Sequence, residues 1–245
     1  MPRARLSLIV VKEGSLPFSY QHILMGFVYA MISREDPSLA EMVHSAKSPK
    51  AFTFSWLWGG KPRVSERSLF YREGSKLRFI FSSWKEELTE AFANAVSNSE
   101  IIKLSGMEVF VNSIEVYREE LSSEEKFILL SPLVLSVPVE KNGKLYHRFL
   151  SPEDGEFPKR FIENLKKRYT MFTDLKAEDA EFIPDSDYIS RKRTSKLVDM
   201  KGTKIRGHLF PFTLRGDEKL IEFGYYAGFG ERTAQGFGCA ELVRR

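Results

Sequence analysis

The sequence predicts an α+β protein built from two tandem ferredoxin-like domains, residues 1–120 and 127–245. The apolar pattern of the first half gives the order strand, helix, strand, strand, helix, strand, which is the βαββαβ order of this fold. The second half repeats much of that order. A length of 245 residues is also enough for two domains of ordinary size.

In the first half, runs of apolar and alternating residues predict strands, and an apolar period near 3.6 residues predicts helices. The expected strands cover residues 3–12, 51–58, 76–83 and 107–119, and the expected helices cover residues 20–33, 36–47 and 84–98. Asp36 as N-cap and Pro37 in the first turn mark the start of the second helix.

A polar stretch at 120–126 is the expected linker, and the pattern restarts after it. We expect a strand interrupted by prolines at 127–139, a helix with a basic face at 156–172, a strand at 204–216, a short helix or strand at 219–228 and a final strand at 238–245. No sequence repeat is visible between the halves, so their similarity lies in the order of elements alone.

Composition excludes several classes of protein. The single cysteine, Cys239, rules out an internal disulfide framework. No apolar run approaches the roughly 18 residues of a membrane span, and the N-terminus lacks the pattern of a secretory signal, so we expect a cytoplasmic protein without a membrane partner. The sequence has no H-E-x-x-H motif and no zinc-ligand spacing, and we expect neither a metal nor a cofactor. It also has no G-x-S-x-G elbow, so acyl-transfer chemistry lacks a nucleophile.

Positive charge is concentrated in one segment. Residues 186–206 hold seven basic and two acidic residues, a net charge of +5 in a chain of +4, so the rest of the chain sums to about −1. One interpretation is a solvated basic loop or an edge strand protected by lysines. The other is a surface that contacts phosphates.

The C-terminal stretch "GYYAGFGERTAQGFG" (224–238) places two Gly-Phe-Gly triplets five residues apart. It is not a dinucleotide fingerprint, because Thr233 stands where a third glycine is needed and no βαβ unit can follow. A Walker A loop is excluded too, because no Gly-Lys-Ser/Thr follows. Two readings remain: a tight turn that needs positive φ angles, and a loop whose backbone approaches a phosphate chain with help from Arg232.

This glycine loop, the βαββαβ order and the segment from Tyr20 to Ser55 resemble the Cas-six endoribonucleases of the RAMP superfamily, which process precursor CRISPR RNA. The resemblance covers nearly the whole chain and implies two RRM-like domains. It also implies a metal-free active site made of Tyr29, His44 and Lys50.

Helix geometry is compatible with these positions. At about 100° per residue, Ile23, Leu24, Phe27 and Met31 share the core stripe of the first helix with Tyr20, whereas Tyr29 points the opposite way. His44 falls off the expected buried stripe of the second helix, which comprises Leu39, Met42, Val43 and Ala46. His22 is a rival for the histidine role or a helix-start hydrogen-bonding residue, and His147 and His208 show no partner pattern. Taken singly, each candidate also has a purely structural reading.

These residue types suit RNA cleavage by the substrate's own 2′-OH. That reaction needs a base for the 2′-OH, an acid for the leaving 5′-oxygen and a cation for the phosphate. Histidine, with a pKa near 6.5, serves as acid or base, lysine supplies charge, and tyrosine is better suited to donating a proton or orienting the substrate. The expected products are a 2′,3′-cyclic phosphate, or the 3′-phosphate to which it opens, and a 5′-hydroxyl. The sequence leaves the acid and base roles of Tyr29 and His44 open.

The expected partner is CRISPR repeat RNA, with effector-complex subunits and a second copy of the chain as further candidates. We expect RNA to be bound by basic and aromatic side chains and by the glycine loop. These candidates are Lys47, Arg63, Arg67, Arg191, Lys192, Arg193, Lys196, Lys204, Arg206, Gly228, Phe229, Gly230, Arg232, Gly236, Phe237 and Gly238. Two alternatives are a RAMP-superfamily protein that holds CRISPR RNA in an effector complex without cleaving it and a general RNA-binding protein.

Overall fold

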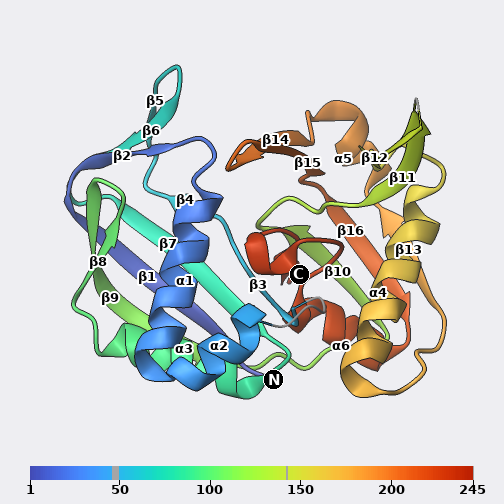
Figure 1. Cartoon of the computed structure of the whole chain (residues 1–245), viewed down its shortest axis with the longest axis horizontal. Coiled ribbons are helices and arrows are strands. Elements are labelled where there is room, and N and C mark those ends of the chain that lie inside the picture. The colour runs from blue at the N-terminus through green and yellow to red at the C-terminus, as the bar shows by residue number, and fades with distance from the viewer. Residues whose placement is uncertain (46–49, 142, 245) are drawn as a thin grey trace.

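The computed structural model describes residues 1–45, 50–141 and 143–244 and has the predicted α+β class, with two sheets side by side (Figure 1). The first sheet has six strands in the order β3-β7-β1-β9-β8, with β4 also paired to β7. Its strands are β1 (Arg3–Lys12), β3 (Phe52–Phe54), β4 (Trp58–Gly59), β7 (Lys76–Ser83), β8 (Ile101–Leu104) and β9 (Met107–Tyr117).

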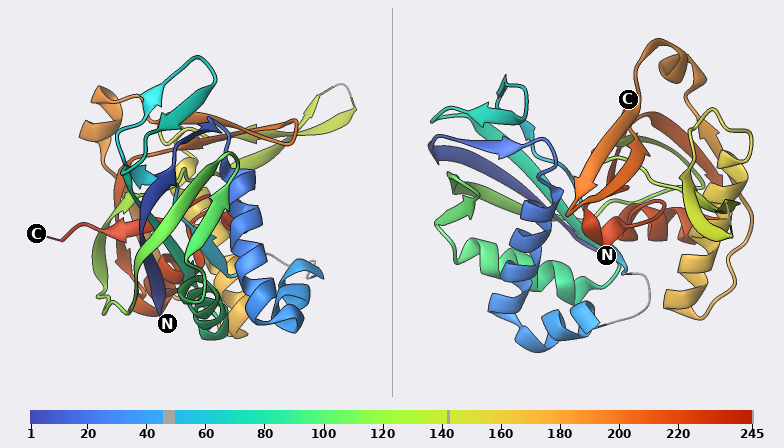
Figure 2. Two further views of the ribbon diagram at one scale, coloured as in Figure 1. Left: turned by 90° about the vertical axis from the view of Figure 1, so that its left-hand side faces the viewer. Right: turned by 45° about the horizontal axis from the view of Figure 1, so that its top comes forward.

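Three helices, α1 (Gln21–Glu35), α2 (Pro37–Ser45) and α3 (Glu86–Ser97), cover one face of this sheet (Figure 2). In β1 the alternate residues Ala4, Leu6, Leu8 and Val10 are buried, as the period of a strand requires. The first strand of the βαββαβ motif lies between the third and the fourth, β7 and β9.

The second sheet repeats this arrangement. Its order is β13-β16-β10-β17, so the first strand, β10, again lies between the third and the fourth. The strands are β10 (Glu124–Leu129), β13 (Ala180–Pro184), β16 (Pro211–Gly216) and β17 (Ala240–Leu242), with helices α4 (Phe157–Thr173) and α6 (Glu218–Ala227). Both halves are therefore ferredoxin-like, as predicted.

Insertions decorate the two folds. A small sheet, β2 (Gly14–Pro17), β6 (Ser68–Tyr71) and β5 (Arg63–Val64), extends the first domain. The second domain carries the hairpin β11 (Ser136–Lys141)–β12 (Lys144–Phe149), the short helix α5 (Ser186–Arg191) and the hairpin β14 (Ser195–Met200)–β15 (Thr203–His208). A 3₁₀ turn, η1 (Thr233–Gln235), lies between α6 and β17.

Several predicted elements of the second half need correction. The stretch 127–139 is not one strand, because β10 ends at Leu129 and β11 begins at Ser136. The predicted strand 204–216 is likewise divided between β15, in the hairpin, and β16, in the main sheet. Sequence reasoning missed β13 altogether, and β10 begins at Glu124, inside the expected linker. The ambiguous segment at 219–228 is helical.

The two domains share a buried contact around Arg3, at the start of β1. Its guanidinium lies 4.1 Å from the centre of the Tyr225 ring in α6 and donates a hydrogen bond to the Cys239 thiol at 3.4 Å. Arg3 is fully buried, and the carboxylate of Glu241 lies 3.8 Å away. The only cysteine of the chain is therefore a packing residue at this joint.

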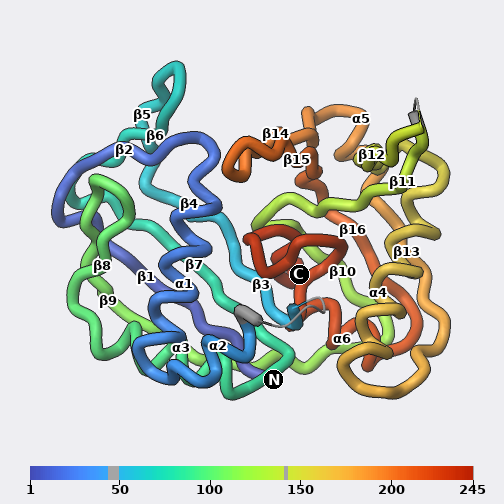
Figure 3. Tube along the Cα trace, in the orientation of Figure 1, coloured from blue at the N-terminus to red at the C-terminus, as the bar shows by residue number. Residues whose placement is uncertain are grey.

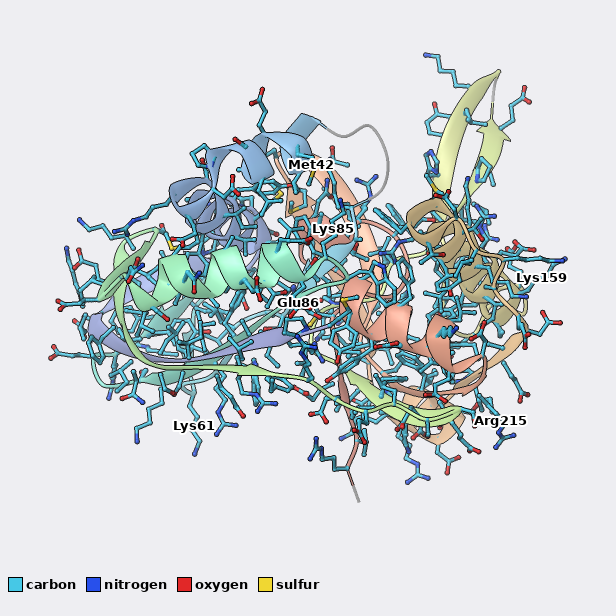
Figure 4. The ribbon with its side chains drawn as sticks, turned by 90° about the horizontal axis from the view of Figure 1, so that it is seen from below. Met42, Lys61, Lys85, Glu86, Lys159 and Arg215 are labelled. Carbon is cyan, nitrogen blue, oxygen red and sulfur yellow. The ribbon has the colours of Figure 1, made fainter. Side chains whose placement is uncertain are left out.

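Helix α2 packs less deeply than predicted. Ala40 and Val43 are buried and Leu39 is half-buried, but Met42 is 44% exposed. Figure 4 labels Met42 at the edge of the molecule. The expected stripe is therefore wrong at Met42, because a two-turn helix at the edge of a domain has only one narrow buried side.

Candidate functional site

A cavity of about 510 Å³ lies between the two domains. Among the described residues, four segments line it: α1, the chain just before β3, α4 and the loop after α6. Figure 1 shows this loop at the centre of the molecule, with α1 to its left and α4 to its right. The lining residues are Met25, Tyr29, Lys50, Asn164, Lys167, Arg168, Met171, Gly230, Glu231, Arg232, Thr233, Ala234 and Gln235.

Tyr29 contributes an aromatic hydroxyl to the cavity from α1. It lies off the fully buried stripe of its helix and is half-buried, with its ring edge-on to Phe52 at 5.9 Å between ring centres. Burial raises the pKa of the Tyr29 phenol. The side chain is therefore protonated at neutral pH and suited to donating a hydrogen bond or a proton.

Lys50 contributes a cation from the chain just before β3. Its main-chain oxygen accepts hydrogen bonds from Thr233 Oγ1 at 3.4 Å and from Arg168 at 3.5 Å, both in the second domain. Burial lowers the pKa of the Lys50 ammonium. The second domain thus helps to hold a residue of the first domain at the cavity.

The structure describes only the main chain of His44, the third residue of the predicted active site. His44 lies in the last turn of α2, six positions before Lys50, but its side chain is outside the described residues. Lys47 is also outside the described residues. The structure therefore brings Tyr29 and Lys50 together at one cavity, while the side-chain position of His44 stays a prediction.

The cavity carries an excess of positive charge. Of the residues that the structure describes, four cations line it, Lys50, Lys167, Arg168 and Arg232, against one carboxylate, that of Glu231. This carboxylate accepts hydrogen bonds from the backbone N–H and the hydroxyl of Ser136, at 3.0 and 2.8 Å. Such a surface attracts a polyanion.

Sequence reasoning missed Arg168, whose guanidinium connects the glycine loop to the main chain of Lys50. It is almost fully buried, and its guanidinium donates to the main-chain oxygens of Ala227, Gly228 and Gly230 at 2.8, 2.6 and 3.1 Å. It also donates to the hydroxyl of Thr233 at 3.3 Å. Burial lowers the pKa of Arg168 to about 10. The predicted basic face of helix 156–172 was the only sequence signal for it.

The glycines of the C-terminal loop are explained by packing within the protein. Gly228, Gly230, Gly236 and Gly238 all have positive φ angles, between 68° and 84°. A Cβ atom at Gly238 would lie 1.8 Å from the main-chain oxygen of Phe229, and one at Gly236 would lie 2.4 Å from the Phe54 ring. The reading of this loop as a tight turn is therefore supported.

The aromatic residues of the loop need a correction. Phe229 and Phe237 are fully buried, and the ring of Phe229 packs against Phe127 and Phe212 at 5.2 Å from each. Neither ring is available to stack on an RNA base. Arg232 is exposed, with a left-handed φ of 59°, and it is the loop residue most open to a ligand.

Arg63 and Arg67, two of the predicted RNA-binding residues, lie apart from the interdomain cavity. Arg63 lies in β5 and Arg67 in the turn before β6, and neither lines the cavity. Figures 1 and 2 place this hairpin at the end of the first domain opposite α2.

The basic segment forms α5 and the β14–β15 hairpin. Arg191, Lys192, Arg193, Lys204 and Arg206 are exposed, and Lys196 is half-buried. The hairpin reaches the start of α1, where the backbone N–H of Asp199 donates to Ser19 Oγ at 2.9 Å.

The remaining histidines have structural contacts. His22 Nδ1 lies 2.9 Å from the Ser19 main-chain oxygen, which agrees with its predicted helix-start alternative. His147 Nδ1 lies 3.3 Å from Ser136 Oγ, and His208 Nδ1 lies 3.1 Å from Thr194 Oγ1. Neither of these two lines the interdomain cavity.

The described part of the chain contains neither a metal-ligand cluster nor a helix that could span a membrane. No group of three or more His, Cys, Asp or Glu side chains there has a geometry that could hold a metal ion. Among residues 1–45, 50–141 and 143–244, no helix is both long and apolar enough to span a bilayer.

Two ferredoxin-like folds, with a glycine-rich loop in the second and a basic cavity between them, define a RAMP-type architecture. Residues 15–115 match the family described as CRISPR-associated protein Cas6, N-terminal, and residues 116–242 match CRISPR-associated protein Cas6, C-terminal. The chain therefore belongs to the Cas6 family.

Relatives with known names are similar over nearly the full length. The chain is 29% identical to the CRISPR-associated endoribonuclease Cas6 of Pyrococcus furiosus, over 93% of this chain and 83% of that protein. It is 28% identical to the CRISPR-associated endoribonuclease Cas6 1 of Methanocaldococcus jannaschii, over 96% and 91%. A solved structure described as a RAMP protein binding different RNA substrates superposes with a TM-score of 0.84 at 26% identity, covering 100% of both chains.

Proposed function

We propose that this protein is a metal-independent endoribonuclease that cleaves precursor CRISPR RNA within the repeat. The main support is that one basic cavity is lined by Tyr29 from α1, by Lys50 from the connection that follows His44, and by the glycine loop of the second domain. Family membership and the two relatives named as endoribonucleases support the same activity.

In the proposed reaction the 2′-oxygen of the nucleotide before the cut attacks the adjacent phosphorus. The bond from the 2′-oxygen to phosphorus forms as the bond to the 5′-oxygen breaks. A base takes the proton of the 2′-OH, and an acid gives a proton to the leaving oxygen. The products are a 2′,3′-cyclic phosphate, which can open to a 3′-phosphate, and a 5′-hydroxyl.

Residue roles follow from the chemistry of each group. Because burial raises its pKa, Tyr29 stays protonated and suits the donor role toward the leaving oxygen. The imidazole of His44 then suits the base role. The ammonium of Lys50 would stabilise the charge that develops on the phosphate oxygens. Lys167 and Arg232 would hold flanking phosphates.

A second candidate is a protein that binds CRISPR RNA without cleaving it. The similarity to a solved RAMP protein described as binding different RNA substrates favours this alternative. Both candidates use the same fold and cavity, so only an activity measurement separates them.

The test is cleavage of the labelled repeat RNA of the chain's own locus in EDTA. We expect one cut by the wild-type protein and a rate at least about 10²-fold lower for His44→Ala, because proton transfer contributes about that much. Binding without cleavage at any metal concentration would support the second candidate. Cleavage that requires Mg²⁺, or full activity of the variant, would contradict the proposal.

A further inference from the structure

A second cavity, of about 380 Å³, lies wholly within the second domain. It is bounded by the end of β12 and the loop after it, by α5 and by the base of the β14–β15 hairpin. It shares no lining residue with the interdomain cavity. Its volume falls in the range of small-molecule sites, about 300 to 1,000 Å³.

One side of this cavity is cationic. Lys192, Arg193 and Arg206 line it, and all three are exposed. The guanidinium of Arg206 donates to Ser195 Oγ at 3.0 Å, which fixes it at the base of the hairpin. These side chains are suited to a phosphate at the cavity mouth.

The floor holds a buried histidine whose hydrogen bonding is incomplete. His208 is only 4% exposed, and its Nδ1 contacts the hydroxyl of Thr194, which also lines the cavity. Its Nε2 is buried and has no hydrogen-bond partner among the described residues. A buried polar atom without a hydrogen bond destabilises the protein, so a ligand that forms a hydrogen bond with this ring would remove that penalty when it binds.

The other walls fit a flat ring rather than a second phosphate. Phe149 and Ile189 provide apolar surface, and the carboxylates of Glu153 and Asp154 stand beside it. Those carboxylates repel phosphate but accept hydrogen bonds from the amino group of a base. A neutral imidazole can donate to or accept from a base edge.

From this arrangement we infer that the cavity binds one unpaired nucleotide of the RNA. Its amino-bearing base enters against His208 and its phosphate lies on Lys192, Arg193 and Arg206. Single-stranded RNA is recognised in this way, by bases turned into pockets and hydrogen-bonded at their edges. This inference rests on the proposed function, because it takes CRISPR repeat RNA as the ligand.

The experiment measures equilibrium binding of the repeat RNA with a 2′-deoxy nucleotide at the cut site, so that cleavage does not interfere. We use a series of these RNAs in which each RNA carries one abasic nucleotide, at a different position. With the wild-type protein we expect at least one abasic position to weaken binding by about 5- to 100-fold, which corresponds to about 1 to 3 kcal/mol per recognised base. The unsubstituted RNA is tested for cleavage in parallel.

Two variants assign that position to this cavity. In His208→Phe the abasic penalty at one of the sensitive positions should fall to less than about twofold, because the base contact is already lost. In Arg193→Gln the penalty for a neutral methylphosphonate at that nucleotide should fall in the same way, because the phosphate contact is already lost. Arg191→Gln is the matched control: it removes the same charge from an exposed residue that does not line the cavity. It should weaken all RNAs equally and keep the wild-type profile. Because Arg193 is exposed, its variant carries the test if His208→Phe fails to fold.

The inference is overturned if every abasic penalty is the same in His208→Phe as in the wild type, or if no methylphosphonate penalty is smaller in Arg193→Gln than in the wild type. An analogue that lacks only the amino group, placed at the assigned position, should reproduce most of the abasic penalty, and no effect would overturn the amino-bearing assignment. If the wild type fails to bind or cleave repeat RNA at all, the proposed function fails first. If the wild type cleaves the RNA normally, but the effects of the RNA change and of the protein substitution on binding are additive, only the nucleotide site is refuted.

Discussion

Thr53 in β3 donates a hydrogen bond of 2.9 Å from its hydroxyl to the main-chain oxygen of Phe237 in the C-terminal glycine loop. This bond joins the sheet of the first domain to the loop of the second. Figure 3 shows the loop after α6 beside β3, near the centre of the molecule. Because residues 230–235 of the same loop line the interdomain cavity, the domain joint and the candidate active site share one segment.

The glycine requirement of this loop can be measured. We expect Gly238→Ala to lower the free energy of unfolding by at least about 3 kcal/mol, since its Cβ would strike the Phe229 carbonyl. Gly202→Ala is the matched control, because Gly202 also has a positive φ, of 87°, but has open space around it. It should cost only about 1 kcal/mol. Equal losses in urea unfolding would contradict the packing argument.

Arg168 should act on stability and on cleavage together. Replacing it with Met leaves the main-chain oxygens of Ala227, Gly228 and Gly230 without their donor, and we expect a loss of at least about 2 kcal/mol. The cleavage rate should also fall, even at temperatures well below the melting temperature of the variant, because the loop and Lys50 lose a common anchor. Lys167→Met, at the exposed neighbouring position, should change stability by no more than about 0.5 kcal/mol. A wild-type melting curve for the Arg168 variant would refute this role.

Lys50 should matter for the chemical step more than for binding. We expect Lys50→Gln to lower the cleavage rate by about 10²- to 10³-fold with little change in RNA affinity, as for the loss of a group that stabilises developing charge. Lys167→Gln removes a charge from the same cavity and should weaken binding by only a few-fold. Burial lowers the pKa of Lys50, so its ammonium loses its proton at a lower pH than an ordinary lysine does. The contribution of Lys50 to the cleavage rate should therefore begin to decline at that lower pH as the pH rises. Equal effects of the two substitutions on the rate would argue against a catalytic Lys50.

His208 should make the fold sensitive to acid. Burial, with a further effect from Arg206, lowers the pKa of His208 to about 4, whereas an unfolded histidine titrates near 6.5. The unfolded state therefore binds more protons between these values, and stability falls as the pH drops from about 6.5 to about 4. The loss should reach about 3 kcal/mol. We expect His208→Phe to show a smaller loss than the wild type over this range in urea unfolding at fixed pH steps, and parallel curves would contradict this.

Much of the first domain could be predicted because its elements have regular periods. β1 alternates fully buried residues with half-buried ones, and α3 has a clear apolar side. The second domain is harder to predict, because hairpins interrupt its motif. The chain leaves one sheet at His208 and enters another at Pro211, and no pattern in "KIRGHLFPFTLRG" marks that change. β13 was missed because its five residues lie in a polar, acidic context.

The site was predictable only in part. Helix periodicity placed Tyr29 off the core stripe, where the structure finds it at the cavity. Sequence cannot tell a phenylalanine that stacks on a base from one that fills a core, so Phe229 and Phe237 were misassigned. Arg168 was missed because its role depends on main-chain oxygens about 60 residues further along the chain, which only the folded structure brings together.

The most direct test of the account is the chemical identity of the upstream product's 3′ end after cleavage in EDTA. If the 2′-oxygen is the nucleophile, mass spectrometry will find a 2′,3′-cyclic phosphate or a 3′-phosphate, and a single 2′-deoxy nucleotide at the cut will abolish cleavage while the RNA still binds. A 3′-hydroxyl with a 5′-phosphate on the downstream product, or cleavage of the 2′-deoxy substrate, would contradict it.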